Sequence, residues 1–347
     1  GQPFVIEEIE IRAPIESEVE VTLTACAICH SDITYAEGAW GGSLPAVYGH
    51  EAAGTITAIG PNTKGVALGD KVVVTLIRSC GTCPSCSTAR PTNCEEPYDG
   101  DHGPIKTAEG GKLHQAMACG GFAEKVVVDA SQVVTLPDGI SMEAASLLAC
   151  GVITGIGAVV NAAKVRPGQD VVVIGAGGVG LNAIQGAAIA GARRIVAVDM
   201  EPSKLDVAKE FGATDAVIAT GEPWKEAKKL IGRGADAVLV TVGVAPVYDQ
   251  APRYLAKGGN IVMVGMPASG AFSSYEAANF AAAGQGMIGS KMGDVVIKRD
   301  IPWMVDLYKQ GRLKLDELIS GTWTLDQINE AIEDTKTGAA KRNVIVF

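Results

Sequence analysis

The sequence lacks the features that mark membrane-spanning, nucleic-acid-binding and secreted proteins. No apolar run reaches the roughly 18–20 residues that a membrane helix needs. A formal net charge of −10 argues against nucleic acid or an anionic membrane as the main partner. The first residues, GQPFVIEEIEIRAP, have neither a basic start nor an apolar core, so we expect no signal peptide there. We also find no internal repeat, and 347 residues are enough for about two globular domains.

The eight cysteines are grouped in a way that favours metal binding over disulfides. Four of them fall within 15 residues: Cys80, Cys83, Cys86 and Cys94. Tetrahedral zinc takes four sulfur ligands, and C-x-x-C turns bring pairs of sulfurs to a suitable spacing. Two disulfides, or four unrelated cysteines, are the alternatives. We expect a structural zinc in a lobe at about residues 78–96, in a reducing, cytoplasmic setting, and a site filled by four sulfurs leaves no position for a substrate.

A glycine-rich turn between a strand and a helix predicts a dinucleotide site. The buried run from Val171 to Ile174 is followed by the turn, and a second buried run, 195–198, ends in Asp199. In this pattern the first glycine permits a tight turn, the second admits a pyrophosphate to the backbone, and the third lets helix and strand pack closely. The helix N-terminus then offers free N–H groups to the phosphates. The turn is Gly175, Ala176, Gly177, Gly178, Val179 and Gly180.

Asp199 indicates which dinucleotide binds. It lies 19 residues after Gly180, where a carboxylate can accept hydrogen bonds from both ribose hydroxyls of NAD and would repel the extra phosphate of NADP. We therefore expect NAD as the cofactor. A purely structural strand–helix–strand unit is the alternative.

The pattern of the chain changes near residue 152. Short β-branched runs separated by turns occupy residues 1–151. After that, apolar runs at 171–174, 195–198, 216–219, 237–241 and 260–264 alternate with helical segments, as in a parallel sheet. We expect an α/β protein with a β-rich domain at 1–151 and a doubly wound Rossmann domain at 152–292. Residues 293–347 predict helices at 301–310 and 325–335 and a last strand at 343–347, which we expect to return to the first domain.

A second group of metal-ligating residue types is dispersed along the chain. It comprises Cys29, His50, Glu51 and Cys150. A lone cysteine is usually a core residue, and a lone histidine is more often a structural or surface residue than a ligand. These residues gain weight because they occur together with a nucleotide-binding pattern and a four-cysteine lobe.

The whole set of motifs resembles the zinc-dependent medium-chain alcohol dehydrogenases. The resemblance rests on motifs that follow in the family's order over essentially the whole length: Cys29-His30-Ser31-Asp32, Gly49-His50-Glu51, the four-cysteine lobe, Cys150-Gly151-x-x-Thr154-Gly155, Gly175–Gly180 with Asp199, and Arg342. It implies a GroES-like catalytic domain beside the Rossmann domain. It also implies two zinc ions per chain, one catalytic and one structural.

The resemblance assigns the catalytic zinc to Cys29, His50 and Cys150. The fourth position on that zinc is then open for water or substrate. Glu51 would be a carboxylate near the metal, with a surface or strand-end acid as the alternative, and Asp32 would orient His50 through its other ring nitrogen.

The family also implies a set of cofactor contacts. Thr154 would lie beside the nicotinamide, and His30 would touch the pyrophosphate unless it is simply solvated. Lys204 resembles a ribose-contacting lysine, with an ordinary surface lysine as the alternative. Arg342 resembles a phosphate-contacting arginine, with a surface salt bridge as the alternative.

The implied reaction is the reversible oxidation of a primary or secondary alcohol to an aldehyde or ketone, by hydride transfer to NAD from a zinc-bound alkoxide. Ser31, two residues after Cys29, would take the hydroxyl proton. Many family members have a histidine three residues further along, where this chain has Thr34. Threonine does not titrate near neutral pH, so we expect a relay through Ser31, the ribose and water.

The substrate is less readable than the reaction. Trp40, Leu76 and Met266 align with the family's pocket walls and predict a mostly apolar pocket for an uncharged alcohol or aldehyde. Trp40 merely capping a loop is the alternative. We expect a polar, glycine-rich loop between Cys94 and Ala123. Cys26 and Cys119 fall outside both zinc sets, and we expect no catalytic role for either.

Two rival classes are less well supported by these residues. Zinc-free enoyl or quinone reductases should lack both ligand sets, and a non-catalytic relative should have lost a catalytic ligand. The resemblance implies a homodimer, with a homotetramer as the alternative, formed by extending the sheet near 260–264 and 287–290.

Overall fold

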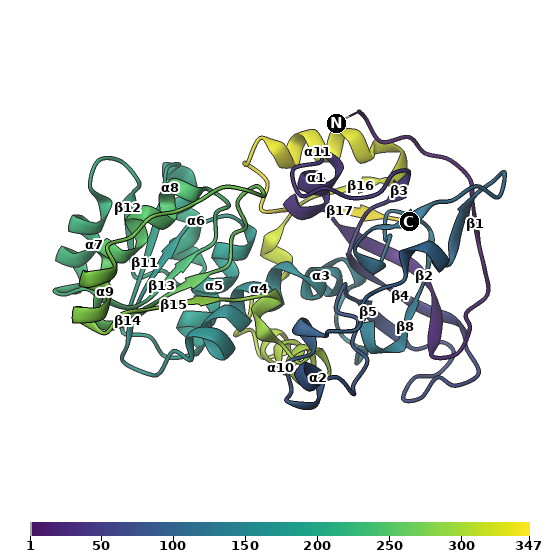
Figure 1. Cartoon of the computed structure of the whole chain (residues 1–347), viewed down its shortest axis with the longest axis horizontal. Helices are drawn as coiled ribbons and strands as arrows, with labels where there is room; N and C mark the ends of the chain where they lie inside the picture. Colours follow the sequence, from purple (N-terminus) through teal and green to yellow (C-terminus); the bar gives the residue numbers. More distant parts are fainter. Residues whose placement is uncertain (1) are drawn as a thin grey trace. The chain divides into compact units, whose positions relative to one another are not determined.

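The computed structural model describes residues 2–347, which form two compact units (Figure 1). The first unit contains the chain up to Gly151 together with Val296–Phe347, and the second is Val152–Val295. The chain therefore leaves the first unit once and returns to it once. Each unit has its own sheet and its own hydrophobic core.

The first unit is built on a seven-stranded sheet of order β16-β17-β2-β4-β5-β9, with β8 also paired to β2. Its central strand β2 (Glu18–Ala27) is antiparallel to β4 (Glu51–Ile59), and alternate residues of β2 are buried. That alternation is typical of a sheet with one face on a core. The other strands of the sheet are β5 (Lys71–Val74), β8 (Lys125–Asp129), β9 (Val133–Thr135), β16 (Ile319–Thr324) and β17 (Arg342–Val346).

The C-terminal segment completes this sheet. β17 pairs antiparallel with β2 in the register Ile345↔Cys26, and β16 pairs parallel with β17. Helix α10 (Ile297–Lys309) begins four residues before the expected position 301, because Val296 serves as the N-cap and Asp300 accepts a hydrogen bond from its N–H. Helix α11 (Ile328–Lys336) follows a short 3₁₀ turn and packs its buried residues into the same core.

The segment from Cys94 to Ala123 is more regular than the expected loop. It contains β6 (Ile105–Thr107), which pairs with β1 (Ile9–Ile11), and β7 (His114–Gln115), which pairs with β3 (Ala46–Val47). The polar composition hid these short pairings, because a two- or three-residue strand leaves no alternation to read.

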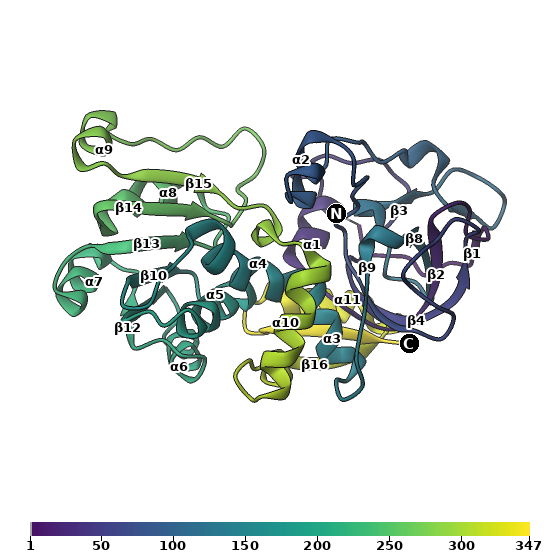
Figure 2. The same ribbon diagram turned by 90° about the horizontal axis from the view of Figure 1, so that it is seen from below.

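The second unit is a six-stranded parallel sheet of order β12-β11-β10-β13-β14-β15. This is a doubly wound order: successive strands are added on one side of β10 as far as β12, and β13 is then added on its other side. The strand order therefore reverses between β10 and β13. Figure 2 shows this sheet with its surrounding helices, turned by 90° from Figure 1. The strands are β10 (Asp170–Ile174), β11 (Arg194–Asp199), β12 (Asp215–Ile218), β13 (Ala235–Val240), β14 (Leu255–Met263) and β15 (Gly286–Gly289).

Local signals explain where the helices of the second unit begin and end. Helix α6 (Pro202–Glu210) and helix α7 (Pro223–Ile231) both start with proline, whose missing N–H is not needed in the first turn. Helix α7 ends at Gly232, which has φ +85°. Helix α5 (Gly178–Ile189) follows the glycine turn after β10, and most of its residues are buried.

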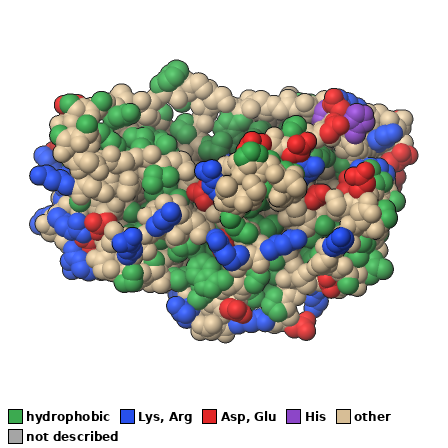
Figure 3. Space-filling model, turned by 60° about the horizontal axis from the view of Figure 1, so that its bottom comes forward, with side chains coloured by type: hydrophobic (Ala, Val, Ile, Leu, Met, Phe, Trp, Pro, Cys, Tyr) green, Lys and Arg blue, Asp and Glu red, His purple; other side chains and the backbone are tan. Residues whose placement is uncertain are grey.

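No single helix in the described part of the chain is long and apolar enough to cross a membrane. One bent pair, Met142–Ala149 with Gly151–Ala163, passes that test on length and composition. Most of the residues of this pair are buried inside the protein. On the face drawn in Figure 3, Lys and Arg side chains are interspersed with Asp and Glu.

Candidate functional site

Four dispersed residues of the first unit meet at one buried point. The ligand atoms of Cys29, His50, Glu51 and Cys150 all lie within 4.8 Å of one another. Cys29 follows β2 and caps helix α1 (His30–Ala36), while His50 directly precedes β4 and Glu51 is the first residue of that strand. Because β2 and β4 are neighbours with Ala27 opposite Glu51, the end of one strand delivers its ligand next to the start of the other.

The Asp32 carboxylate links the backbone and ring of this group by hydrogen bonds. One carboxylate oxygen accepts hydrogen bonds from the Gly49 N–H at 2.9 Å and from His50 Nδ1 at 2.9 Å. The other accepts from the Cys29 N–H at 3.1 Å. Asp32 is fully buried, so these bonds replace its hydration. They fix His50 Nδ1 as the protonated nitrogen and leave Nε2 with its lone pair.

The donor set fits a divalent metal. His50 Nε2 is buried and makes no hydrogen bond, which is costly unless the lone pair has another partner. The hydrogen bond between Cys150 and Cys29 lowers the pKa of the Cys29 thiol and raises that of Cys150, so Cys29 is the more readily ionised of the two sulfurs. Two sulfurs and one imidazole are the ligands of a catalytic zinc with one open position, for which alcohol dehydrogenase is the standard example.

Glu51 and Arg342 lie close together in the protein interior next to these ligands. Arg342 Nη2 lies 3.7 Å from Glu51 Oε1, and neither side chain is more than 5% exposed. Burial raises the pKa of Glu51 to about 8, although the nearby guanidinium opposes the shift. Neither residue is on the surface, although Glu51 is a strand-end acid, as its alternative allowed, because it is the first residue of β4. Arg342 also explains Gly151, where a Cβ would lie 2.2 Å from Arg342 Nη2.

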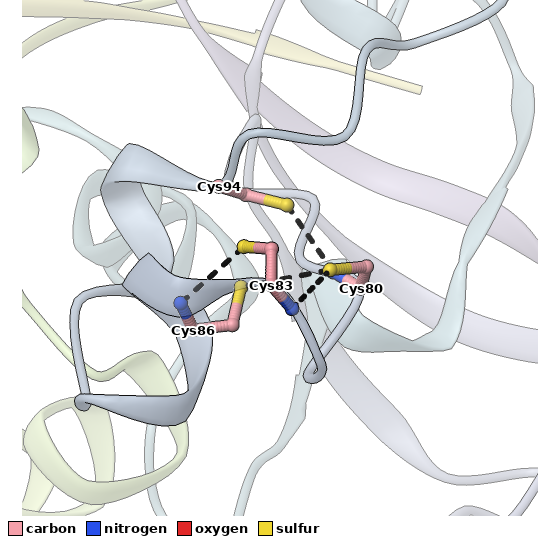
Figure 4. Close-up of side chains that lie close together, drawn as sticks. All are labelled: Cys80, Cys83, Cys86 and Cys94. Atoms are coloured by element: carbon pink, nitrogen blue, oxygen red, sulfur yellow. Dashed lines mark hydrogen bonds between the residues drawn. The ribbon is translucent and has the colours of Figure 1, made fainter.

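The four cysteines of the 78–96 lobe form a second candidate metal site, shown in Figure 4. The sulfurs of Cys80, Cys83, Cys86 and Cys94 lie within 4.8 Å of one another. Backbone N–H groups point at them, from Cys83 to Cys80 Sγ at 3.3 Å and from Cys86 to Cys83 Sγ at 3.4 Å. Hydrogen bonds from Thr82 and Cys83 lower the pKa of Cys80 to about 6. All eight cysteines are free of disulfides, so the disulfide alternative is wrong.

The glycine turn of the second unit leaves room beside its backbone. Gly175 has φ +99°, and a Cβ on Gly180 would lie 1.8 Å from the Gly175 carbonyl oxygen, so both positions require glycine. A Cβ on Gly177 would meet no atom within 4 Å. The turn lies at the carboxyl end of β10, beside the point where the strand order reverses, which is where such sheets bind ligands. This geometry fits a pyrophosphate.

Asp199 lies next to this turn at the end of β11. Its carboxylate accepts hydrogen bonds from the N–H groups of Ala176 at 2.7 Å and Glu201 at 3.0 Å. The sequence predicted the position of this acid but not the two backbone bonds that fix it. A carboxylate has about four acceptor sites, so two remain for a ligand.

The other expected cofactor residues are divided between the two units. In the second unit, Lys204 is half-buried on α6, and Thr154 lies on α4 (Gly151–Gly157) with Oγ1 3.8 Å from Met292 Sδ. In the first unit, His30 is exposed at the first position of α1.

The expected proton-relay and pocket residues lie as follows. Ser31 is half-buried in the first turn of α1, and Thr34 Oγ1 donates to the His30 carbonyl at 2.7 Å. The Trp40 and Tyr35 rings meet edge to face at 5.1 Å. Leu76 is half-buried in the first unit, whereas Met266 belongs to the second unit and is 62% exposed.

Comparison with known proteins agrees with this geometry. A family model described as alcohol dehydrogenase GroES-like domain matches residues 15–138, and one described as zinc-binding dehydrogenase matches residues 178–310. An NDMA-dependent alcohol dehydrogenase of Amycolatopsis methanolica is 36% identical over 356 residues, which cover 100% of this chain and 96% of the relative.

Two solved structures extend the likeness to three dimensions. An alcohol dehydrogenase zinc-binding domain protein from Burkholderia ambifaria has a TM-score of 0.96 at 34% identity, covering 100% of this chain and 96% of that one. A benzyl alcohol dehydrogenase from Acinetobacter calcoaceticus has a TM-score of 0.93 at 32% identity, covering 99% and 96%. The chain belongs to the zinc-binding medium-chain alcohol dehydrogenase family, and its fold is a GroES-like domain with a Rossmann-like parallel sheet.

Proposed function

We propose that the protein is an NAD-dependent zinc alcohol dehydrogenase of class EC 1.1.1.1, which interconverts primary or secondary alcohols with aldehydes or ketones. The observation that carries the proposal is the buried meeting of Cys29, His50 and Cys150 around an imidazole nitrogen that has no hydrogen-bond partner. In this proposal residues 1–151 with 293–347 are the catalytic domain, and residues 152–292 bind the nucleotide.

The chain's own residues would prepare the metal site. Cys29, His50 and Cys150 hold the catalytic zinc, and Cys80, Cys83, Cys86 and Cys94 hold the structural one. A catalytic zinc supplies Lewis acidity that lowers the pKa of a bound hydroxyl. Asp32 keeps the His50 imidazole in the tautomer that can bind. Glu51, with Arg342 at 3.7 Å, supplies a buried carboxylate whose charge is sensitive to its surroundings.

Ser31 is the group we assign to the substrate's proton. It lies two residues after Cys29 on the first turn of α1, and its hydroxyl can both accept and donate. Thr34 cannot replace the family's histidine as a titrating station, and its hydroxyl already donates to the His30 carbonyl. Ser31 Oγ would accept the substrate's proton and donate its own onward, and bound cofactor and water would supply the next acceptor.

NAD is the cofactor we assign to the second unit. Its nicotinamide accepts the hydride. The open side of Gly177, the N-terminus of α5 and the fixed carboxylate of Asp199 support binding of the pyrophosphate and the adenosine ribose. A 2′-phosphate would meet the negative charge of Asp199, which favours NAD over NADP. We assign His30, Thr154, Lys204 and Arg342 as further cofactor contacts.

The substrate we propose is an uncharged alcohol with an apolar body. Trp40, Leu76 and Met266 provide apolar surface, and benzyl alcohol is a reasonable probe because a benzyl alcohol dehydrogenase is among the similar structures.

The experiment is an initial-rate comparison of primary, secondary and aromatic alcohols with NAD and NADP in parallel. We expect NAD-linked oxidation of at least one group of alcohols, with NADP at least tenfold poorer, since two like charges about 4 Å apart near a protein surface repel by about 4 kcal/mol and about 1.4 kcal/mol is enough for a tenfold difference. Equal rates with both cofactors would contradict the role of Asp199. Zinc-loaded protein that oxidises none of the alcohols would contradict the assigned substrate class.

A further inference from the structure

The N-terminal segment makes a contact that the catalytic assignment does not use. Phe4 is bound on both sides of its backbone by one side chain of α11: its N–H donates to Asn329 Oδ1 at 2.8 Å, and its carbonyl accepts from Asn329 Nδ2 at 2.9 Å. These groups are 325 residues apart in the sequence. In Figure 1 the purple start of the chain runs beside α11. A paired amide–backbone contact of this kind fixes the position of one residue rather than of a whole segment.

The ring of Phe4 packs on two other aromatic rings. It meets Tyr48 edge to face, with centroids 5.5 Å apart, and Phe122 with centroids 6.3 Å apart. Both partners are more than nine-tenths buried in the core of the first unit, while Phe4 is partly buried against that core. Edge-to-face pairs of this kind add to the stabilisation from buried area.

Tyr48 and Phe122 enclose the turn that carries His50. The Phe122 N–H donates to the Tyr48 carbonyl at 2.8 Å, and the Gly121 N–H donates to the Gly49 carbonyl at 2.7 Å. Gly49 has φ +92°, and a Cβ there would lie 2.7 Å from Phe122 Cδ1. The turn therefore has no space in which to shift while the rings stay in place.

The same turn is held from its other side by Asp32. The Gly49 N–H and His50 Nδ1 share one oxygen of that carboxylate. His50 is thus positioned by two independent restraints, the buried carboxylate and the aromatic packing that ends at Phe4. Loss of the outermost ring leaves a cavity into which Tyr48 and Phe122 can relax, and close-packed interiors transmit such changes to their neighbours.

We propose that Phe4, held by Asn329, is a positioning residue for the catalytic metal site: it fixes the Gly49–His50 turn through Tyr48 and Phe122. The proposal rests on the function assigned above only in that Cys29, His50 and Cys150 bind zinc. Phe4 touches none of these ligands, so its effect is on how firmly the metal is held.

The test is the rate at which zinc leaves the protein for a coloured chelator. The phase that belongs to the His50 site is the one missing in Cys150→Ser, and the remaining phase belongs to the four-cysteine lobe. We expect Phe4→Ala to speed release from the His50 site by about threefold to tenfold, below the roughly 10–100-fold effect of losing a direct partner of a ligand. Asn329→Ala should act in the same direction, and Phe4→Tyr, which keeps the ring, should restore the slow rate.

A matched control separates positioning from general stability. Val128 is buried in the same core, but it pairs with Val19 near the start of β2. The metal ligands lie at the other end of that strand, where Ala27 pairs with Glu51. Val128→Ala should lower the Tm without changing release from the His50 site. Phe4→Ala with unchanged release, or Val128→Ala with an equal increase, would overturn the proposal. Wild-type protein with no zinc at the His50 site would overturn the assigned function as well.

Discussion

At the scale of single residues, the site depends on groups that hold the ligands as much as on the ligands themselves. Asp32 is not one of the grouped candidate ligands, yet its carboxylate accepts hydrogen bonds from the Cys29 N–H, the Gly49 N–H and His50 Nδ1. The ring of His50 presents Nε2 to the neighbouring sulfurs only while Nδ1 is held in this way. Changes at such a residue should therefore show in metal affinity.

Asp32→Asn tests this dependence. The amide keeps the shape of the side chain, but it has one acceptor oxygen where the carboxylate has two and cannot accept from all three donors. We therefore expect zinc affinity at the His50 site to fall by about 10–100-fold. Competition with a chelator of known affinity measures it. Asp138→Asn, at a side chain that is 98% exposed, is the control and should leave the affinity unchanged. Unchanged affinity in Asp32→Asn would show that the carboxylate does not orient the ligand.

Two glycines of the nucleotide turn should respond differently to the same substitution. Gly180→Ala places a methyl 1.8 Å from a carbonyl oxygen, and we expect it to destabilise the protein by about 1–3 kcal/mol as overpacking does. Gly177→Ala meets no atom and should leave the Tm unchanged while weakening NADH binding. Thermal unfolding and quenching of protein fluorescence by NADH separate the two effects. If Gly177→Ala bound NADH normally, the pyrophosphate would not approach the turn there.

At the scale of elements, the four-cysteine lobe is held by its sulfurs rather than by a core. Helix α2 (Pro84–Ser87) has only four residues, none of them buried, and Cys83 Sγ accepts the Cys86 N–H at its start. A helix this short is not stable alone. We therefore propose that the lobe needs an ion to hold its shape.

Cys94→Ser should remove that ion. In the proposed function each site holds one zinc, so we expect zinc content to fall from two ions per chain to one and the Tm to fall with it. Metal analysis and calorimetry measure the two changes. The turn of the second unit should still bind NADH, because none of its residues belongs to the lobe. Full zinc content in Cys94→Ser would contradict the four-sulfur site.

The features that could be predicted from the sequence are those formed by residues close together in the chain. The four-cysteine lobe and the Gly175–Gly180 turn are local motifs, and the sequence was enough to predict their geometry. Cys29, His50 and Cys150 lie far apart in the chain, so only the family resemblance grouped them. The pairing of Phe4 with Asn329 and the packing of Arg342 over Gly151 left no sequence signal, since each depends on how β17 and α11 return to the first sheet.

At the scale of the whole molecule, the second unit exposes an apolar surface at the edge of its sheet. Residues 267–283 contain one charged residue, Glu276, and nearly all of them are exposed, including every residue of α9 (Ala277–Ala283) except the half-buried Phe280 and Ala283. In the described part of the chain β15 pairs only with β14, so one side of it is open. Open strand edges and contiguous exposed apolar patches often mark a surface that binds a partner. We propose a homodimer formed through this edge.

Ala281→Arg tests the dimer by placing a charge in this surface. We expect the wild type to have twice the chain mass of 35.7 kDa and Ala281→Arg to have that mass itself, measured by light scattering after gel filtration. Leu68→Arg, at an exposed apolar side chain of the first unit, should remain dimeric. A monomeric wild type would contradict the proposed interface, and a mass of four chains would support the tetramer.

The central claim is that the zinc held by Cys29, His50 and Cys150 is required for NAD-linked alcohol oxidation. The most direct test is to remove the zinc of the His50 site with a chelator, identified as the release phase that is missing in Cys150→Ser. Zinc is then restored in steps, and the initial rate of NADH formation is measured from benzyl alcohol or from whichever alcohol reacts fastest. The account predicts a rate that is lost with that zinc and returns in proportion to the zinc restored, while Cys150→Ser stays inactive at every zinc concentration. Full activity in protein that carries only the structural zinc would contradict it.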